Sequence, residues 1–271
     1  MNEKIKPQKN NAPIGVFDSG IGGLSVLHEL EILLPSENFI YFGDSANVPY
    51  GEKSTEDLIK FSRNILDYFA TQNVKMVVMA CNTSSSVTLD VVKNDYDFDV
   101  FGLLDPISSY LSEINDSNIA IMATSATINS NAYKNKILEY SDKNVFQVAC
   151  PGLVELVEDD KVNTKEAQEL VKSYLEPVLK NNIQKLILGC THYPFLKDAI
   201  LRITKEDILL NPAIYLAKAV HKTLLEKNLL NNSSSGWAKF LCSGDVQDFT
   251  RIGSKFYGQA FVAEFLELNK I

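Results

Sequence analysis

The chain has 271 residues, of which 45% are hydrophobic and 22% are charged, and its formal net charge at pH 7 is −8. This is the composition of a soluble globular protein, and its acidic balance argues against nucleic acid and anionic membrane as main partners. No run of residues approaches the roughly 18 apolar positions of a membrane span. The polar segment 1–12 lacks the apolar core of a secretion signal, so we expect a disordered tail there.

The cysteines indicate a reducing compartment. They stand at positions 81, 150, 190 and 242, no two closer than 40 residues. This spacing argues against a disulfide framework or a zinc ribbon, and we see no cluster with the spacing of metal ligands. We therefore expect a cytoplasmic protein with free thiols.

The first half of the chain alternates apolar runs with amphipathic segments. Strands are predicted at 14–18, 38–44, 74–80 and 99–104, and helices at 24–34, at 58–70 and after the polar residues 81–86. This order predicts a parallel sheet with helices on both faces.

The second half repeats the plan. Strands are predicted at 118–124, 145–150 and 185–190, and helices at 166–180 and 193–203. Pro194 fits the first turn of its helix, whereas Pro177 is expected to bend or end the other. After a polar loop at 230–236, the segment 237–245 has the pattern of a strand, which we expect to return to the first half.

The two halves of the sequence can be aligned with each other. Asp18 and Thr124 each stand at a strand end and are 106 residues apart, and Cys81 and Cys190 each follow a strand and are 109 residues apart. We expect two similar α/β domains, the first made of 13–105 and 215–271 and the second of 106–214, with the site in the cleft between them.

Polar clusters follow four of these strands, where parallel sheets bind ligands. They are DSGIGG (18–23), CNTSSS (81–86), ATSAT (123–127) and CTH (190–192). DSGIGG offers backbone N–H groups at the start of a helix, which suits an anion, but a tight turn explains the glycines equally well. Its spacing matches neither a dinucleotide fingerprint nor a P-loop.

Cys81 and Cys190 allow two interpretations. A free cysteine is most often a buried thiol, which is how we interpret Cys150 and Cys242. A thiol at a helix N-terminus, however, has its pKa lowered below about 8.5, and His192 could exchange a proton with Cys190. One thiolate and one thiol on opposite sides of a cleft could remove and return a proton and so invert a carbon centre.

Together these motifs resemble those of the glutamate racemase family. The resemblance runs through IGVFDSGIGGLSVL, YFGDSANVPYG, MACNTSSS, ATSATINSNAY and LILGCTHYPFL, and covers nearly the whole chain after the tail. It implies a racemase that needs no cofactor and interconverts L- and D-glutamate, with two pseudo-symmetric α/β domains. It also implies a homodimer that supplies D-glutamate for peptidoglycan.

The resemblance also implies roles for single residues. Cys81 would take the α-proton from D-glutamate with Asp18 as its acidic partner, and Cys190 would take it from L-glutamate with His192 as its partner. Glu158 would be an acidic residue near the second thiol. The implied substrate contacts are Asp18, Ser19, Tyr50, Gly51, Asn82, Thr83, Thr127, Thr191 and His192.

Three alternatives remain at the level of sequence. An aspartate racemase with two cysteines would differ in substrate only. A hydrolase would need one nucleophilic cysteine and form an acyl-enzyme. A two-lobed binding protein would hold glutamate without inverting it and would need no pair of thiols.

Overall fold

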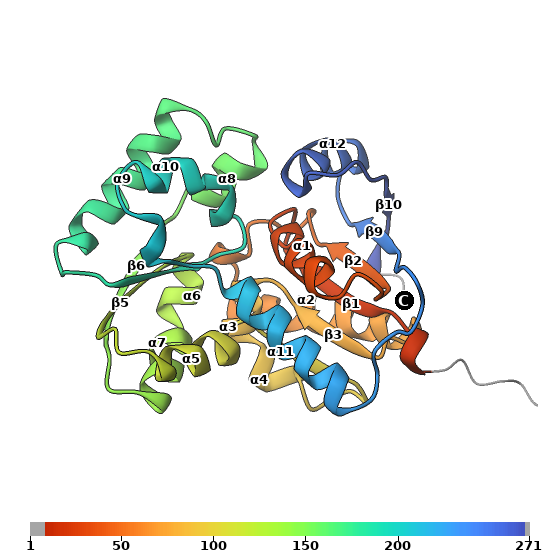
Figure 1. Cartoon of the computed structure of the whole chain (residues 1–271). Coiled ribbons are helices and arrows are strands. Elements are labelled where there is room, and N and C mark those ends of the chain that lie inside the picture. The colour runs from red at the N-terminus through yellow and green to blue at the C-terminus, as the bar shows by residue number, and fades with distance from the viewer. Residues whose placement is uncertain (1–8, 269–271) are drawn as a thin grey trace, which may run out of the picture.

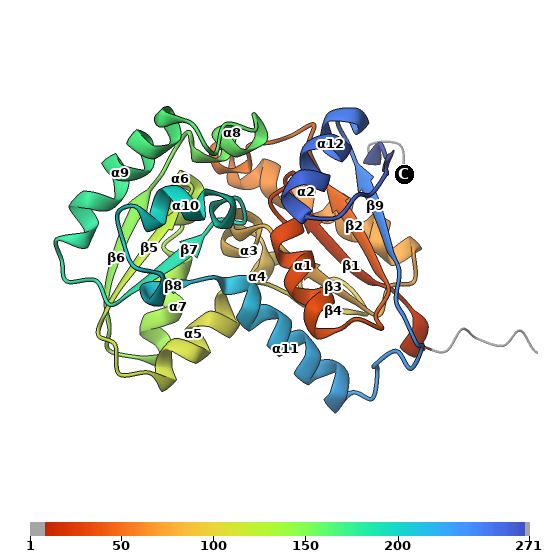
Figure 2. The same ribbon diagram turned by 45° about the horizontal axis from the view of Figure 1, so that its top comes forward.

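The computed structural model describes residues 9–268. Figure 1 shows two α/β lobes side by side, with the middle of the chain in one lobe and both the early and the late segments in the other. Each lobe is built on its own parallel sheet, as the turned view in Figure 2 also shows. The predicted fold class of two parallel-sheet α/β domains is thus confirmed.

The first sheet has six parallel strands in the order β10-β9-β2-β1-β3-β4. The strands are β1 (Ile14–Asp18), β2 (Phe39–Gly43), β3 (Met76–Met79), β4 (Asp99–Phe101), β9 (Ala238–Cys242) and β10 (Ala263–Phe265). The helices of this lobe are α1 (Leu24–Leu33), α2 (Thr55–Thr71), α3 (Asn82–Val87), α4 (Leu89–Val92), α11 (Pro212–Glu226) and α12 (Val246–Tyr257). A 3-10 turn, η2 (Tyr50–Glu52), precedes α2.

Helices cover both faces of this sheet because successive side chains of a strand point to opposite sides. Val16 of β1 belongs to the same apolar cluster as Leu27 of α1. Its neighbour Phe17 belongs to a second cluster, with Phe69 of α2, whose ring centroid lies 6.5 Å away. The near-continuous apolar runs of these strands follow from burial on both faces.

The second sheet has four parallel strands in the order β6-β5-β7-β8. They are β5 (Asn118–Ala123), β6 (Asn144–Ala149), β7 (Lys185–Gly189) and β8 (Leu209–Leu210). Around them lie α5 (Leu104–Glu113), α6 (Ser125–Asn129), α7 (Ala132–Tyr140), α8 (Leu153–Glu158), α9 (Lys165–Leu179), α10 (Lys197–Leu201) and the 3-10 turns η3 (Tyr193–Leu196) and η4 (Glu206–Ile208).

The two sheets repeat one arrangement. β1 lies between β2 and β3, and β5 lies between β6 and β7. Asp18 and Thr124 therefore occupy equivalent strand ends, as do Cys81 and Cys190. The return of the C-terminal segment is confirmed as well, since β9 pairs in parallel with β2, opposing Phe39 with Ala238.

Several predicted elements are wrong in detail. The strand expected at 99–104 ends at Phe101, and α5 begins at Leu104. The helix expected at 193–203 is a 3-10 turn followed by the short α10. Pro177 lies inside α9, which continues to Leu179, so the proline does not end that helix.

The expected disordered tail lies mostly outside the described residues, which begin at Lys9. Lys9–Asn11 form a 3-10 turn instead of a disordered segment. The carbonyl of Asn10 accepts a hydrogen bond from Lys75 Nζ at 2.7 Å, and that of Asn11 accepts one from Asn38 at 2.9 Å. These contacts fix the turn against the first sheet.

Two helices connect the lobes. The proposed boundaries at 105/106 and 214/215 fall inside α5 and α11, respectively. These helices pack against each other, with the rings of Tyr110 and Tyr215 4.3 Å apart between centroids. We infer that both chain crossings between the domains run through this helix pair, which Figure 1 shows below the sheets.

Candidate active site

The strand ends that carry the polar motifs meet at one cavity between the lobes. It is a small cavity. The cavity is lined by Ser19, Tyr50, Gly51, Cys81, Asn82, Thr83, Thr124, Val154, Cys190, Thr191 and His192. Every lining residue except Gly51 is buried, so little of the cavity is open to solvent.

The first thiol lies between β3 and α3. Cys81 is the N-cap of α3, and its Sγ accepts a hydrogen bond from the backbone N–H of Ser84 at 3.5 Å. Burial, and then the negative charge of Asp18, raise the pKa of the Cys81 thiol to about 12. The expectation that the helix N-terminus lowers this pKa is therefore wrong, because desolvation outweighs the single N–H contact.

The second thiol has an imidazole beside it. Cys190 follows β7, and its Sγ lies 3.7 Å from His192 Nδ1. It does not cap a helix as predicted, because the next turn, η3, has His192 as its N-cap. The two thiols thus reach the cavity in different local structures.

A carboxylate completes a chain of three groups at the second thiol. Glu158, the last residue of α8, places Oε1 2.7 Å from His192 Nε2. Burial lowers the pKa of His192, but its hydrogen bonds to Cys190 and Glu158 outweigh burial and place the pKa well above its usual value. His192 thus lies between the carboxylate of Glu158 and the sulfur of Cys190 and can exchange a proton with either.

Asp18 lies behind the cavity and connects the lobes. It is fully buried, and its Oδ2 accepts hydrogen bonds from the N–H groups of Gly20 and Gly23 at 3.2 and 2.9 Å. Its Oδ1 accepts one from the hydroxyl of Thr191 at 3.2 Å. Burial raises the pKa of this carboxyl despite the nearby charge of His192. No hydrogen bond joins Asp18 to Cys81, so Asp18 acts on that thiol through its charge.

The glycine turn at 18–23 is not a free anion site. The N–H groups of Gly20 and Gly23 are taken by Asp18, and that of Ile21 donates to Glu158 Oε1 at 3.2 Å. This corrects the prediction that these amides would hold an anionic ligand. They hold the protein's own carboxylates instead, one from each lobe.

The implied substrate contacts do not all face the cavity. Tyr50 lines it, but its hydroxyl donates to Asp44 Oδ2 at 2.5 Å. Thr127 is absent from the lining and hydrogen-bonds Thr124 through their hydroxyls at 3.0 Å. The other implied contacts, apart from Asp18, line the cavity.

Two lining residues, Thr124 and Val154, are not among the predicted contacts. The signal for Thr124 is present in the sequence, since it is the repeat counterpart of Asp18. Its hydroxyl hydrogen-bonds that of Thr83 at 2.9 Å, across the boundary between the lobes. Val154 stands in an apolar stretch of α8 and carries no such signal.

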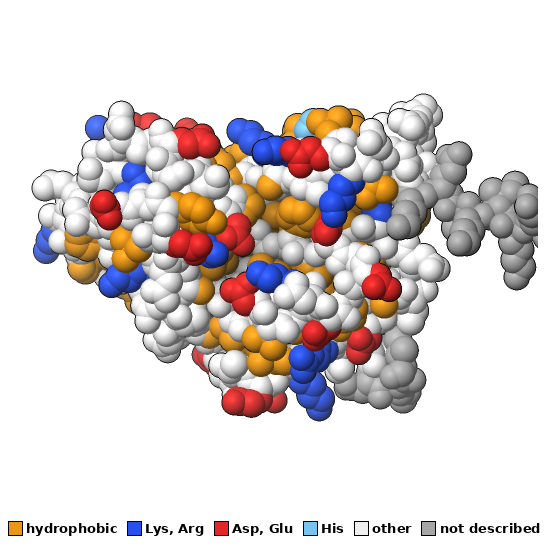
Figure 3. Space-filling view, turned by 90° about the horizontal axis from the view of Figure 1, so that it is seen from below, with side chains coloured by type: hydrophobic (Ala, Val, Ile, Leu, Met, Phe, Trp, Pro, Cys, Tyr) orange, Lys and Arg blue, Asp and Glu red, His pale blue; other side chains and the backbone are white. Residues whose placement is uncertain are grey.

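Other features of the molecule lie apart from this cavity. Within residues 9–268, no three His, Cys, Asp or Glu side chains gather as metal ligands, and no helix is long and apolar enough to cross a membrane. A larger open groove lies between α9 and α10 and contains none of the motif residues. On the face in Figure 3, basic and acidic side chains are interspersed and form no continuous basic patch.

The comparisons with known proteins agree with this geometry. The sequence profile of the Asp/Glu/hydantoin racemase family matches residues 14–218. A glutamate racemase of Carboxydothermus hydrogenoformans is 40% identical over 251 residues, which cover 92% of this chain and 94% of that protein.

Solved structures give the same result. Glutamate racemase from Francisella tularensis in complex with D-glutamate has a TM-score of 0.90 at 34% identity, covering 97% of this chain and 100% of that one. An aspartate racemase from Picrophilus torridus has a TM-score of 0.60 at 19% identity, covering 81% and 98%, which is a likeness of fold alone. The chain belongs to the Asp/Glu/hydantoin racemase family and, within it, to the glutamate racemases.

Proposed function

We propose that the protein interconverts L- and D-glutamate by proton transfer between the α-carbon and two thiols, without a cofactor. One observation carries this proposal: Cys81 and Cys190, from different sheets, line the same cavity. A single nucleophile would not need a second thiol from the opposite lobe. Two thiols on either side of a carbon are what inversion requires.

The surroundings of the thiols give each a starting state. With a pKa raised to about 12, Cys81 carries its proton at neutral pH. His192 lies 3.7 Å from the sulfur of Cys190, and its raised pKa suits it to hold the proton that Cys190 gives up in the proposed reaction. The proposal therefore takes Cys81 as the proton donor and Cys190 as the proton acceptor at the start of the reaction.

L-Glutamate fits this starting state. The Cys190 thiolate removes the α-proton, and Cys81 gives its proton to the opposite face of the carbon. The S–H bond of Cys190 forms as the Cα–H bond breaks, and the new Cα–H bond forms as the S–H bond of Cys81 breaks. D-Glutamate reverses each step, with Cys81 as the base, in the assignment that the resemblance implies.

Neutral donors must hold the two carboxylates of the substrate. The residues that line the cavity include no Lys or Arg, and its side-chain donors are those of Ser19, Asn82, Thr83 and Thr124, since the hydroxyl of Thr191 donates to Asp18. In a buried site such fixed dipoles stabilise developing charge more strongly than they would in water. The substrate's own ammonium group would favour the thiolate of Cys81.

The test is circular dichroism of D- or L-glutamate with purified protein and no added cofactor. Wild type should bring either enantiomer to the racemate, and Cys81→Ser and Cys190→Ser should each lose at least about 10³-fold in rate. Cys150→Ser and Cys242→Ser are matched controls, because both residues are buried outside the cavity, and they should retain activity. Near-normal turnover by either cavity variant would refute the two-thiol scheme.

Deuterated water separates this scheme from others. The product enantiomer should gain α-deuterium much faster than the remaining substrate does, because the returning proton comes from a thiol on the opposite face. Racemisation without solvent exchange would contradict it. An acyl-enzyme would indicate the hydrolase, and binding of glutamate without inversion would indicate a binding protein.

Assay of both amino acids tests the choice between glutamate and aspartate. Glutamate is favoured because relatives at 38–41% identity are glutamate racemases, whereas the aspartate racemase shares the fold alone. Faster inversion of aspartate would reverse the assignment.

The physiological proposal is that the protein supplies D-glutamate for peptidoglycan, as a cytoplasmic homodimer. All four cysteines are free and buried, which suits a reducing compartment. Depletion of the protein should make growth depend on added D-glutamate, and sedimentation should give twice the monomer mass of 30.2 kDa.

A further inference from the structure

Asn82 lies where a substrate donor is needed, and its amide has two different ends. The residue follows Cys81, lines the cavity and is buried. Its Oδ1 accepts a hydrogen bond from the hydroxyl of Tyr133 at 2.6 Å. No described residue accepts a hydrogen bond from its Nδ2, so the N–H end of the amide is left for a ligand.

Tyr133 comes from the opposite lobe. It lies on α7, which contacts α3, and Figure 2 shows both helices near the boundary between the lobes. Its side chain is fully buried and does not line the cavity. It therefore cannot touch a ligand there and can act only through Asn82.

The hydroxyl of Tyr133 sets which way the amide points. Burial, and then the charge of Cys190, raise the pKa of this phenol far above its usual value, so it keeps its proton. In the part of the chain that the structure describes, that proton has one acceptor, Asn82 Oδ1. Turning the amide over would leave the buried O–H without an acceptor, which disfavours the turned form roughly tenfold or more.

We propose that Tyr133 is a positioning residue that directs the N–H end of Asn82 into the cavity, toward a carboxylate of the bound amino acid. The inference rests on the proposed function for the identity of that ligand. In this arrangement the orientation of the Asn82 N–H donor depends on contact between the lobes, since Tyr133 and Asn82 belong to different lobes. Without the hydroxyl, the oxygen end of the amide could face the substrate carboxylate and repel it.

The test is a double-mutant cycle with wild type, Tyr133→Phe, Asn82→Ala and the double variant. Tyr133→Phe keeps the buried ring and should raise KM for glutamate about tenfold while kcat stays within about threefold. In the Asn82→Ala background the same change should alter KM by less than about twofold. Tyr96→Phe is the matched control, because it removes a hydroxyl that donates to Asp67 at 2.8 Å on the surface, and it should leave KM unchanged.

A merely structural role gives a different result. Tyr133→Phe would then lower the melting temperature and change KM by the same factor in the wild-type and Asn82→Ala backgrounds. Equal changes in KM in the two backgrounds would overturn the proposal, and so would a wild-type KM in Tyr133→Phe. Calorimetric titration of the four proteins with D-glutamate gives the cycle from dissociation constants if turnover is slow. It also separates the two claims: binding without inversion refutes the proposed function, while the binding cycle still decides the role of Tyr133.

Discussion

Single residues make the two halves of the cavity chemically unequal. Asp18 raises the pKa of Cys81 by its charge, whereas its repeat counterpart Thr124 carries no charge beside the second thiol. Cys190 instead has His192 and, behind it, Glu158. A symmetric fold therefore surrounds its two thiols with different groups, and the proposed reaction uses this difference by taking one thiol as the acid and the other as the base.

Glu158→Gln should remove the charge that holds His192 as an imidazolium. The pKa of His192 then falls, and the alkaline limb of the pH profile of kcat/KM should move to lower pH, with roughly a tenfold loss near neutral pH. If the alkaline limb of the pH profile is unchanged in Glu158→Gln, Glu158 does not take part in the reaction.

The same change should also affect stability, with a defined sign. Because the pKa of His192 is raised in the folded state, its protonation stabilises the fold. This stabilisation is complete below the unfolded-state pKa of about 6.5 and disappears as pH rises through the folded-state pKa. The loss in melting temperature on Glu158→Gln should be largest near about pH 6 and should shrink at higher pH. A loss that grows with pH would contradict this assignment.

Gly22→Ala should displace both His192 and its neighbour Thr191. A Cβ at this position would lie 2.3 Å from His192 Nδ1 and 2.6 Å from Thr191 Oγ1. Since a displacement of about 1 Å can cost roughly 100-fold, we expect a loss of that order in kcat at near-normal melting temperature. Wild-type turnover would show that the turn and the imidazole can move apart.

How far the sequence predicts these residues depends on what each contacts. Cys81 and Cys190 were predictable, because strand ends and an internal repeat are local patterns. The raised pKa of Cys81 was not, since it arises from burial and from Asp18, 63 residues earlier. Tyr133 has no local signal, because its partner is 51 positions away in the other lobe.

At the scale of elements, the long strands could be predicted from the sequence, whereas the shortest edge strands could not. Runs such as 14–18 and 118–123 are apolar throughout because both faces are covered. β8 has two residues and β10 has three, too few for a periodic pattern, and neither was expected. α12 was missed as well, although its apolar side packs on α1 and the first sheet.

One buried ion pair joins four segments that are distant in sequence, at the end of the first sheet away from the cavity. Lys75 pairs with Glu37, and its Nζ also donates to the carbonyls of Asn10 and Leu229, the latter at 2.8 Å. Glu37 Oε1 accepts from the N–H of Asn231 at 2.8 Å. Because both side chains are buried, every charge in this cluster depends on its partners.

Lys75→Met should therefore lower the free energy of unfolding by roughly 3–5 kcal/mol, since it leaves the Glu37 charge buried and unpaired. KM and kcat at low temperature should stay near wild type, because the pair lies outside the cavity. Lys93→Met, which removes an exposed pair with Asp90, is the control and should cost less than about 1 kcal/mol. Equal losses in the free energy of unfolding in the two variants would show that the buried Lys75–Glu37 pair stabilises the fold no more than an exposed pair does.

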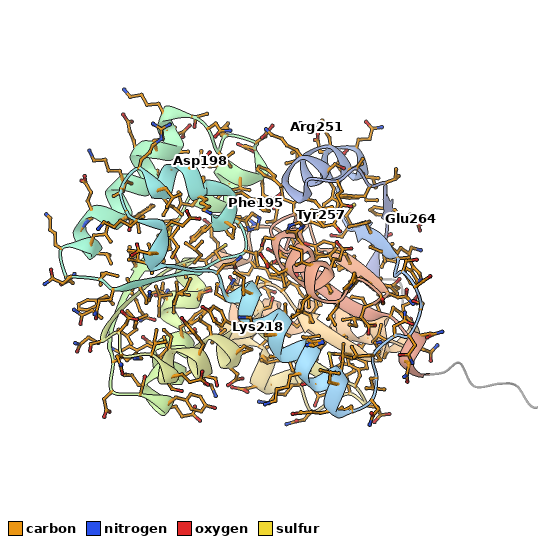
Figure 4. The ribbon with its side chains drawn as sticks, in the orientation of Figure 1. Phe195, Asp198, Lys218, Arg251, Tyr257 and Glu264 are labelled. Carbon is orange, nitrogen blue, oxygen red and sulfur yellow. The ribbon has the colours of Figure 1, made fainter. Side chains whose placement is uncertain are left out.

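At the scale of the molecule, the cavity is largely buried and must open for a ligand to pass. α12 of the first lobe reaches the second lobe at two points, where Lys255 pairs with Asp160 and where the ring of Phe256 lies 4.5 Å from that of Phe195. Figure 4 shows Phe195 and Tyr257, the residue next to Phe256, on opposite sides of this boundary. These contacts hold the two lobes together at this end of the boundary.

Phe256→Ala should make opening easier. Cys81 and Cys190 are 4% and 5% exposed as residues, so we expect a thiol reagent to reach them only when the lobes separate. We expect the labelling rate to rise about tenfold in Phe256→Ala, and saturating D-glutamate to slow it. Trp237→Ala, which removes an exposed ring outside the cavity, should label like wild type. Equal labelling rates in wild type and Phe256→Ala would show that the Phe256 contact does not control the separation of the lobes.

The return of β9 and β10 to the first sheet has a consequence for synthesis on the ribosome. β2 gains its second neighbour only when residues 238–242 have been made, after the whole second lobe has emerged. Until then the nascent chain presents β2 as an unpaired edge, the kind of edge that other chains can join. We expect a polypeptide that stops before Ala238 to aggregate, and the finished protein to acquire its first sheet last.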